Sequence, residues 1–434
     1  MLATPFSKLM RLSMLNNHLH MTCKTLWELP KTIQLDEKYL LDPNNIHKID
    51  DNTKHRKSRG NIKLVHELYN RLNSLKCTSS SYEEIKELFD KECLEIPNKT
   101  HPDVFKYGNS PKVVKYVGQK RTFEFAHKEF SEIAKNLNLV RTDQLGNLSG
   151  SRSYYLLGQM AELEQALVRY FVGNLIKNGF QLVSVPDILP RNVVESCGMS
   201  TQGERTQVYT LDSEMYGPDL CLSGTSEIAL AGYLSNKIKH VKELPLKLCS
   251  VSRCYRAETS SIAEERGIFR VHEFTKVEMF IVAHPLQSDL ILEEIRTLQE
   301  LLFESLEIHF QVLDMPPHDL GAPAYRKYDI EAWMPGRNIY GEISSCSNCT
   351  DFQSRRLNIQ YKNSKGDCDF VHTLNGTACA IPRLLIALTE THQESNGVIS
   401  IPQVLQKFMN GKKVIERQKK IPQLMLIKNK KNKF

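Results

Sequence analysis

The sequence predicts a globular protein that mixes helices with strands, in the α/β or α+β class. Its 434 residues suggest two or three domains. A content of 41% hydrophobic and 25% charged residues excludes a disordered chain, a collagen-like chain and a small disulfide scaffold. The stretch 158–410 alternates helical and strand patterns, which makes it the candidate catalytic region. No run of 18 apolar residues occurs, so we expect no membrane partner.

The N-terminal segment has the composition of a targeting sequence. The first 27 residues contain no Asp or Glu and carry Lys8, Arg11 and Lys24 between apolar and hydroxyl side chains. This pattern is typical of a mitochondrial transit peptide, which we predict over residues 1–30, with the mitochondrial matrix as destination. An ordinary disordered terminus is the alternative. Up to residue 58 the chain is expected to be poorly folded, apart from an apolar patch at 26–41.

Residues 60–96 are predicted to form a helical hairpin. Apolar residues recur at helical spacing from Ile62 to Leu75, and again from Tyr82 to Cys93. The polar residues 77–81 between them form a turn with a candidate helix cap. The hairpin is either a projecting antiparallel arm or an element packed on the body. Residues 97–157 carry turn signals and are expected to be a connector.

A long helix followed by a short strand opens the candidate catalytic region. Apolar residues from Met160 to Ile176 form one helical face, and Gly179 ends the helix. The next five residues, 181–185, have strand character and are closed by Pro186.

Two further strands place charged and aromatic side chains on one surface. The first strand is predicted at 247–258, and a polar loop at 259–267 connects it to a second strand at 269–282. Alternation puts Arg270, His272, Phe274, Lys276 and Glu278 on one face of the second strand. Because Arg binds phosphate bidentately and Phe offers a stacking surface, the pair of strands would suit a nucleotide. A solvated sheet face is the alternative.

Two later segments add candidate phosphate ligands. Glu342 with a nearby hydroxyl could hold Mg²⁺, which prefers carboxylates together with substrate phosphates. Pro382 suits the first turn of a helix, so Arg383 lies near a helix N-terminus, where anions are favoured.

The remaining outlying features are cysteines and a basic tail. Eleven cysteines without a framework favour a reducing compartment. Cys346 and Cys349 form one Cys-x-x-Cys, but zinc needs four ligands and no second such pair exists.

Residues 411–434 hold nine Lys or Arg and one Glu, so this basic C-terminal tail carries a net charge of +8 and the rest of the chain −1. The tail either contacts phosphates or is a solvated terminus, and its apolar residues could dock on the body.

Taken together, three segments resemble the signature motifs of class II aminoacyl-tRNA synthetases. The helix and strand ending at Pro186 resemble motif 1, the stretch from Arg256 to Phe274 resembles motif 2, and residues 380–383 resemble motif 3. Other segments narrow the resemblance to seryl-tRNA synthetases: Thr225-Ser-Glu227, Ser345–Arg356, Ile96–Asp103 and Arg141–Gly146. The Pro-Arg form of motif 3, the short helical arm and the N-terminus without acidic residues resemble the animal mitochondrial branch of that family. The similarity covers roughly residues 60–410. The sequence departs from the family pattern at Pro382, usually Gly, at Ser226, usually Ala, and at Thr377, usually Ser.

This resemblance implies an α+β fold, with an antiparallel sheet flanked by helices and a short N-terminal antiparallel helical arm. It implies an N-terminal region at 31–140 that binds tRNA through the arm, a catalytic domain at 141–410, and a homodimer formed partly through motif 1. The implied activity is the activation of serine with ATP and Mg²⁺, followed by transfer of serine to tRNA(Ser) for mitochondrial translation.

The resemblance also implies a role for each site residue. Arg256 and Arg383 would act catalytically on the phosphates, with Arg256 also near serine. Val271, Phe274 and Glu258 would hold adenine, and Glu342 and Ser345 would bind Mg²⁺ and ATP. The serine ligands would be Thr225, Glu227, Glu278 and Thr377.

Two other functions remain open at this point. A catalytically silent paralogue that binds RNA or a partner protein would be expected to have lost motif arginines or serine ligands, all of which are present. An enzyme that charges a carrier protein in place of tRNA would share the adenylate chemistry, whereas the arm and the basic tail favour RNA.

Overall fold

The computed structural model describes residues 33–58, 60–76, 80–142, 152–203, 206–217, 219–258 and 267–418. The predicted transit peptide, most of the loop after Glu258 and the outer part of the basic tail lie outside the described residues. None of the helices in these ranges is both long and apolar enough to cross a membrane.

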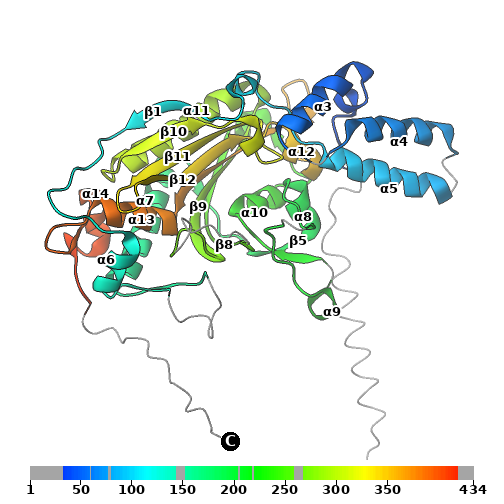
Figure 1. The fold of residues 1–434 in the computed structure, drawn as a ribbon. Coiled ribbons are helices and arrows are strands. Elements are labelled where there is room, and N and C mark those ends of the chain that lie inside the picture. The colour runs from blue at the N-terminus through cyan, green and yellow to red at the C-terminus, as the bar shows by residue number, and fades with distance from the viewer. Residues whose placement is uncertain are drawn as a thin grey trace, which may run out of the picture.

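An eight-stranded sheet forms the centre of the described structure (Figure 1). Its order is β1-β10-β11-β12-β15-β9-β8-β4, and every neighbouring pair is antiparallel except β4 with β8. The predicted α+β class with an antiparallel sheet is therefore confirmed. In this order the strands span Lys112–Val117, Phe310–Asp314, Arg326–Met334, Ile339–Asn348, His372–Ala380, Glu273–Ala283, Leu246–Tyr255 and Gln181–Leu182.

Helices cover both faces of the sheet, and the alternation along β9 shows how. Val277, Met279 and Ile281 are buried in the main core, which includes α7 (Gln159–Lys177), α11 (Ser288–Glu304) and α13 (Ile381–Thr391). Phe280 and Val282 belong to a second cluster on the opposite face. That cluster includes residues of α8 (Arg191–Ser196), α10 (Ser226–Tyr233) and α12 (Phe352–Leu357).

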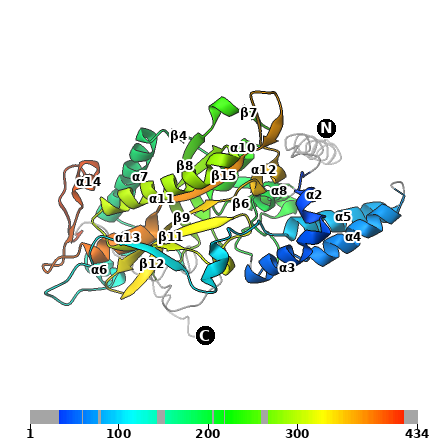
Figure 2. The ribbon, with the colours of Figure 1, turned by 90° about the horizontal axis from the view of Figure 1, so that it is seen from above.

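The helical hairpin is present as predicted and projects from the body (Figures 1 and 2). Its helices are α4 (Ile62–Ser74) and α5 (Ser80–Glu95), and they pack through a small core of their own. In Figure 2 the hairpin lies at one end of the molecule, with α6 (Phe130–Asn136) and α14 (Gln403–Gln406) at the other.

The expectation of a poorly folded chain up to residue 58 is wrong for the described part. Residues 37–55 form α2 (Glu37–Leu40) and α3 (Ile46–His55). The buried Arg56 explains this order, because its guanidinium donates to the carbonyl oxygens of Asn98 at 3.0 Å and Ala324 at 2.8 Å. Such tertiary contacts are invisible in the periodicity of a ten-residue polar helix.

The predicted connector at 97–157 also contains structure. β1 forms an edge of the main sheet, and α6 buries Phe130 and Ile133 in the main core. The predicted boundary at residue 140 therefore cuts through elements that belong to one core. The boundary at 410 does so too, because β17 (Val414–Ile415) pairs with β16 (Ile399–Ser400) and Ile415 is fully buried.

Three predicted strands begin or end elsewhere. The strand predicted from residue 269 begins at Glu273, because Arg270 and His272 lie in an irregular approach in which His272 Nδ1 interacts with the Tyr209 hydroxyl at 2.8 Å. The strand predicted to 258 ends at Tyr255, and the motif 1 strand is limited to Gln181–Leu182. The predicted helix of motif 1 matches α7, and Pro382 lies in the first turn of α13 as expected.

Candidate active site

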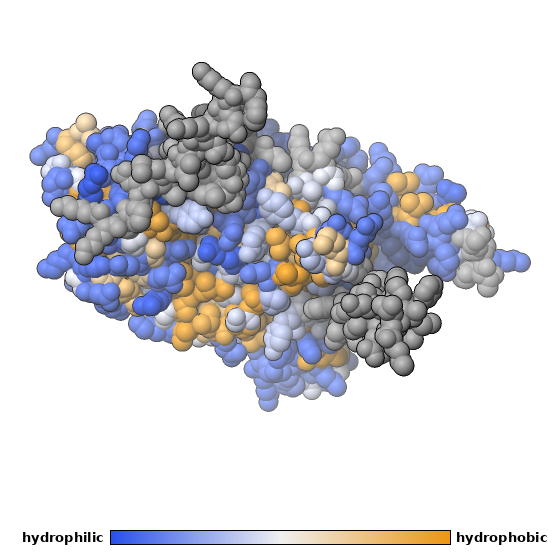
Figure 3. All heavy atoms as spheres, turned by 90° about the horizontal axis from the view of Figure 1, so that it is seen from below, coloured by the Kyte–Doolittle hydropathy of each residue, from blue (hydrophilic) through white to orange (hydrophobic). Residues whose placement is uncertain are grey.

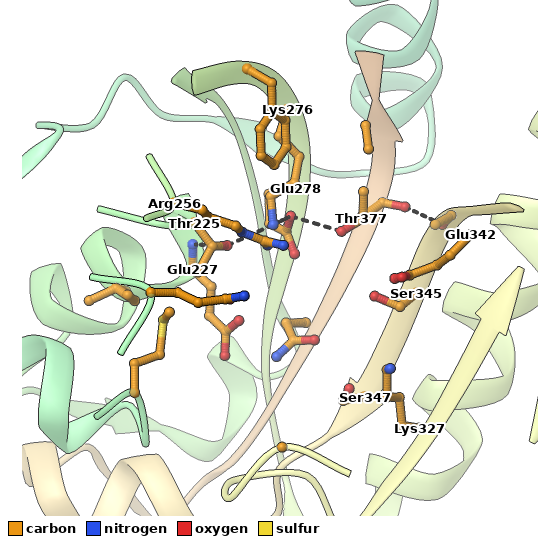
Figure 4. Close-up of a pocket in the computed structure, with 18 of the residues that line it drawn as sticks. Thr225, Glu227, Arg256, Lys276, Glu278, Lys327, Glu342, Ser345, Ser347 and Thr377 are labelled. Atoms are coloured by element: carbon orange, nitrogen blue, oxygen red, sulfur yellow. Dashed lines mark hydrogen bonds and ion pairs between the residues drawn. The ribbon is translucent and has the colours of Figure 1, made fainter. Parts of the chain in front are cut away.

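One cavity of about 480 Å³ is lined by all eleven residues that the sequence singled out, and Figure 4 labels several of them. They come from the central strands β9, β12 and β15, from the segment that follows β8, from the approach to β9, and from the starts of α10 and α13. Sheet pairing therefore brings together positions more than 150 residues apart in the sequence. The eleven are Thr225, Glu227, Arg256, Glu258, Val271, Phe274, Glu278, Glu342, Ser345, Thr377 and Arg383.

The start of α10 fixes one wall of the cavity. Thr225 is the N-cap of this helix, and its hydroxyl accepts the backbone N–H of Glu227 at 3.3 Å. The Glu227 carboxylate accepts from Gln353 Nε2 at 2.6 Å. Burial raises the pKa of Glu227, and the negative charge of Glu278 raises it further. Two carboxylates thus share this end of the cavity, where a ligand cation would be stabilised.

Glu278 lies between two donors on the same wall. The Thr377 hydroxyl donates to Glu278 Oε2 at 3.2 Å, and Lys276 forms an ion pair with the same carboxylate. Lys276 also donates to the Thr225 hydroxyl at 2.8 Å, so it joins β9 to the α10 wall. These groups are almost fully buried.

Arg256 differs from these paired groups. Its guanidinium lies over the Phe274 ring at 5.4 Å. Its Nε atom is buried and has no hydrogen-bond partner within the described ranges. A buried guanidinium donor is costly to leave unpaired, so this position suits an anionic ligand. Next to it, Glu258 pairs with Arg270 at 3.4 Å and accepts from Gln207 at 3.3 Å.

The opposite end of the cavity holds Glu342 and Arg383. Their ion pair measures 3.0 Å, and Arg383 also donates to the Phe269 carbonyl at 3.2 Å. Burial alone would raise the pKa of Glu342, but the charges of Arg383, Lys327 and Arg256 outweigh it and lower the pKa to about 2. Glu342 is therefore a carboxylate at neutral pH, in a cationic surrounding.

Three functional candidates were missed or left without a role by sequence reasoning. Lys276 lies on the predicted strand face, and its place between Phe274 and Glu278 was the available signal. Gln353 is held by the Thr373 hydroxyl at 2.7 Å, and Lys327 pairs with Asp329 at 2.8 Å. Nothing in the spacing of Gln353 or Lys327 indicates these contacts.

The Cys-x-x-Cys pair does not form a recognisable metal site. Cys346 is buried in the main core, whereas Cys349 lines the cavity. Burial raises the pKa of both thiols, so both are protonated. In the described part of the chain, no group of three or more His, Cys, Asp or Glu side chains could hold a metal ion.

Comparisons with known proteins place the chain in a family. Residues 209–392 match a family model described as "tRNA synthetase class II core domain (G, H, P, S and T)". The chain is 45% identical over 334 residues to "Serine--tRNA ligase, mitochondrial" of Bos taurus, which covers 76% of this chain and 64% of the relative. It is 41% identical over 373 residues to the mitochondrial serine–tRNA ligase of Saccharomyces cerevisiae, with coverage of 84% and 81%.

A solved structure extends the similarity to the fold. The seryl-tRNA synthetase of Pyrococcus horikoshii, crystallised with ATP, superposes with a TM-score of 0.74 at 32% identity, covering 86% of this chain and 93% of that one. The chain spans 64% of the length of the bovine relative, which is less than two thirds, compared with 81% of the yeast relative and 93% of the Pyrococcus horikoshii chain. From the sequence match to the yeast enzyme and the shared fold and motifs, the chain belongs to the seryl-tRNA synthetase family of class II aminoacyl-tRNA synthetases.

Proposed function

We propose that this protein is a serine–tRNA ligase of the mitochondrial matrix, which activates serine with ATP and transfers it to tRNA(Ser). The observation that carries the proposal is the cavity itself. Four glutamates and five Lys or Arg residues line it, and the buried Nε of Arg256 has no partner among the described residues. Such a site can hold a zwitterion and a polyphosphate side by side.

Serine would bind at the α10 end. Its ammonium group would meet Thr225 and Glu227, and its carboxylate would meet Arg256. Glu278 and Thr377 would receive the side-chain hydroxyl, since a Glu278 oxygen already accepts from Thr377. A buried acceptor left unpaired by alanine would disfavour that competitor by up to about 10⁴-fold.

The nucleotide would lie along the strands toward Arg383. Arg256 would bind the α-phosphate, and Arg383 the γ-phosphate at the far end. Adenine would stack on Phe274 and be held by Glu258 and the backbone near Val271, the buried residue on the approach to β9. The match to a seryl-tRNA synthetase structure that contains ATP supports this arrangement.

The chemistry then depends on charge and position. The serine carboxylate attacks the α-phosphorus of ATP and pyrophosphate leaves, forming seryl-adenylate. A carboxylate is already ionised at neutral pH, so the step needs no general base. Two arginines would hold two anions in line and stabilise the charge that develops in the transition state.

Glu342 and Ser345 would hold Mg²⁺ together with the phosphates. The donor set fits this ion, because an ionised carboxylate and a hydroxyl provide hard oxygen ligands and Mg²⁺ takes the rest from water and substrate. When bound, it would supply positive charge that the arginines alone do not provide.

Transfer of serine to a terminal ribose hydroxyl would require tRNA to reach the same cavity. The projecting hairpin α4–α5 is the element we assign to tRNA, with the rest of residues 31–140 supporting it. Its distance from the cavity-bearing sheet in Figures 1 and 2 suits a contact with a distant part of the tRNA.

We further propose a homodimer in which motif 1 contributes to the interface. Exposed apolar side chains lie on α7, β4 and α11, the elements that resemble this motif or adjoin it: Ile176, Leu182, Leu290 and Leu301. Figure 3 shows that hydrophobic residues also gather in the middle of the face seen from below. Exposed apolar patches of this kind mark association surfaces.

Nothing in the described structure favours a catalytically silent paralogue, since every inferred ligand lines the cavity. The deciding experiment measures serine-dependent ATP–pyrophosphate exchange and then serine charging of mitochondrial tRNA. Serine-dependent exchange without charging of any tRNA would point to a carrier-protein substrate. Absence of exchange would refute the proposal.

A further inference from the structure

Among the described residues that line the cavity, Lys276 touches two of the inferred serine ligands without having a role of its own. It pairs with the Glu278 carboxylate and donates to the Thr225 hydroxyl at 2.8 Å (Figure 4). Only 5% of the residue is exposed. A buried lysine is costly unless it is paired, so its position between these two groups calls for an explanation.

The charges at this end of the cavity provide that explanation. Glu227 and Glu278 together carry two negative charges, whereas the serine ammonium group brings only one positive charge. Burial and the charge of Glu278 already raise the pKa of Glu227. Lys276 supplies the missing positive charge, and it does so on the Glu278 side.

We propose that Lys276 is a specificity-determining positioning residue, which neutralises Glu278 so that this carboxylate accepts a neutral hydroxyl and Glu227 alone receives the substrate ammonium. The inference rests on the proposed function and deepens it. It explains how a site with two carboxylates selects an amino acid with an uncharged polar side chain. An ammonium in place of the serine hydroxyl would meet Lys276 and be repelled.

The test compares serine with L-2,3-diaminopropionate, which carries an ammonium group where serine carries its hydroxyl. ATP–pyrophosphate exchange is measured for the full-length wild-type protein and for Lys276→Met. This substitution keeps a long, unbranched side chain but removes its charge. We expect the KM for serine to rise about 100-fold, as for loss of one partner of a buried ion pair, with the KM for ATP unchanged. The preference for diaminopropionate over serine should rise at least about tenfold, because Glu278 is left without its cation.

Two variants serve as controls. Lys276→Arg keeps the charge and should keep the wild-type preference even if its KM is higher. Lys115→Met breaks another lysine–glutamate pair, with the buried Glu300 of α11, outside the cavity. It should leave both the KM for serine and the preference unchanged.

An unchanged preference in Lys276→Met would overturn the proposal, since a purely structural lysine would affect both amino acids equally. If Lys276→Met fails to fold, the comparison moves to Glu278→Gln and the double variant Glu278→Gln/Lys276→Met, in which no carboxylate is left uncompensated. The proposal expects that adding Lys276→Met to Glu278→Gln changes the KM for serine little relative to Glu278→Gln alone. A further 100-fold loss would reject it, whereas the absence of serine-dependent exchange in the wild-type protein would refute the proposed function instead.

Discussion

At the scale of single residues, most polar groups of the cavity are paired with one another, whereas Arg256 keeps a donor without a partner among the described residues. At the α10 end, Thr225, Lys276 and Glu278 satisfy one another before any ligand arrives. Arg256 is packed over an aromatic ring, and its buried Nε lacks an acceptor among the described residues. The first group is therefore paired within the folded protein, whereas Arg256 keeps a buried donor that the proposed anionic ligands could use.

Replacing Arg256 by alanine is expected to abolish serine-dependent exchange while leaving thermal stability within about 1 °C. Removal of a charged donor to a developing negative charge typically costs 10²–10³-fold or more in rate, and few interactions of the folded state depend on this side chain. Arg253→Ala is the matched control, because Arg253 is a half-exposed arginine on β8, three residues before Arg256, and does not line the cavity. Exchange at the wild-type rate in Arg256→Ala would contradict its assignment.

A second prediction concerns Glu390, which joins three elements and does not line the cavity. Its carboxyl accepts the backbone N–H groups of Phe130 at 2.9 Å and Gly336 at 2.8 Å. Burial raises the pKa of Glu390 from 4.5 to about 7. Between these two pKa values, the Glu390 carboxyl is protonated in the folded state but ionised in the unfolded state. The free energy of unfolding therefore falls as the pH rises through this range.

The stability of the wild type relative to Glu390→Gln should therefore fall by roughly 2–3 kcal/mol between pH 5 and pH 8. Comparing two pH values cancels any constant effect of the amide. Urea unfolding of both proteins at equal concentration measures the difference. A difference in stability that does not depend on pH would show that Glu390 is not protonated in the folded state.

At the scale of elements, the periodicity of apolar residues predicted those helices whose bounds depend on the local sequence alone. The hairpin helices, α7 and the turn into α13 follow from apolar spacing, glycine and proline. α3 and β1 were missed, because α3 depends on Arg56 bound to distant carbonyl groups and β1 is an exposed edge strand with a weak apolar pattern. The start of β9 was placed four residues too early, since alternation continues through an irregular segment that the contacts of His272 interrupt.

The residues of the candidate site also divide into those that the sequence predicted and those that only the three-dimensional structure brings together. The roles of all eleven residues came from the resemblance to a known family, although Glu278, Glu342 and Thr377 lie outside its motif segments. Lys327 belongs to no such segment, and only the pairing of β11 with β12 brings it to the cavity. Gln353 lies within the Ser345–Arg356 segment, but its contact with Glu227 depends on the position of α12 beside α10.

Shortening the hairpin tests its assignment to tRNA. The rings of Tyr69 and Phe89 lie 6.1 Å apart across the two helices, so residues 70–88 can be replaced by a four-residue Gly/Ser linker without disturbing the base. We expect unchanged serine exchange and a KM for tRNA raised at least about tenfold, which corresponds to about 1.4 kcal/mol of binding free energy. Charging at wild-type efficiency would make the hairpin a purely structural element.

At the scale of the whole molecule, the charge is uneven. Residues 411–434 carry a net +8, so the remaining chain carries −1. The structure divides this tail, because Ile415 is buried and the Gln418 backbone N–H donates to the Leu137 carbonyl at 3.0 Å. Residues 411–418 therefore dock on the body, as one of the two interpretations of the sequence allowed.

Two truncations separate docking from phosphate binding. Removing residues 419–434 takes away six lysines and no acidic residue, and leaves the docked strand intact. If these lysines bind tRNA phosphates, affinity for tRNA should fall, and the slope of log affinity against log salt should decrease by about 0.7–0.9 for each phosphate that is no longer neutralised. The melting temperature of this shorter truncation should stay unchanged.

Removing residues 411–434 should weaken tRNA binding to a similar extent but also lower the melting temperature, since Ile415 leaves the core. Affinity measured at three salt concentrations, together with a melting curve for each protein, gives both quantities. An unaltered salt slope in the shorter truncation would exclude the outer tail from tRNA binding and assign the tail to folding alone.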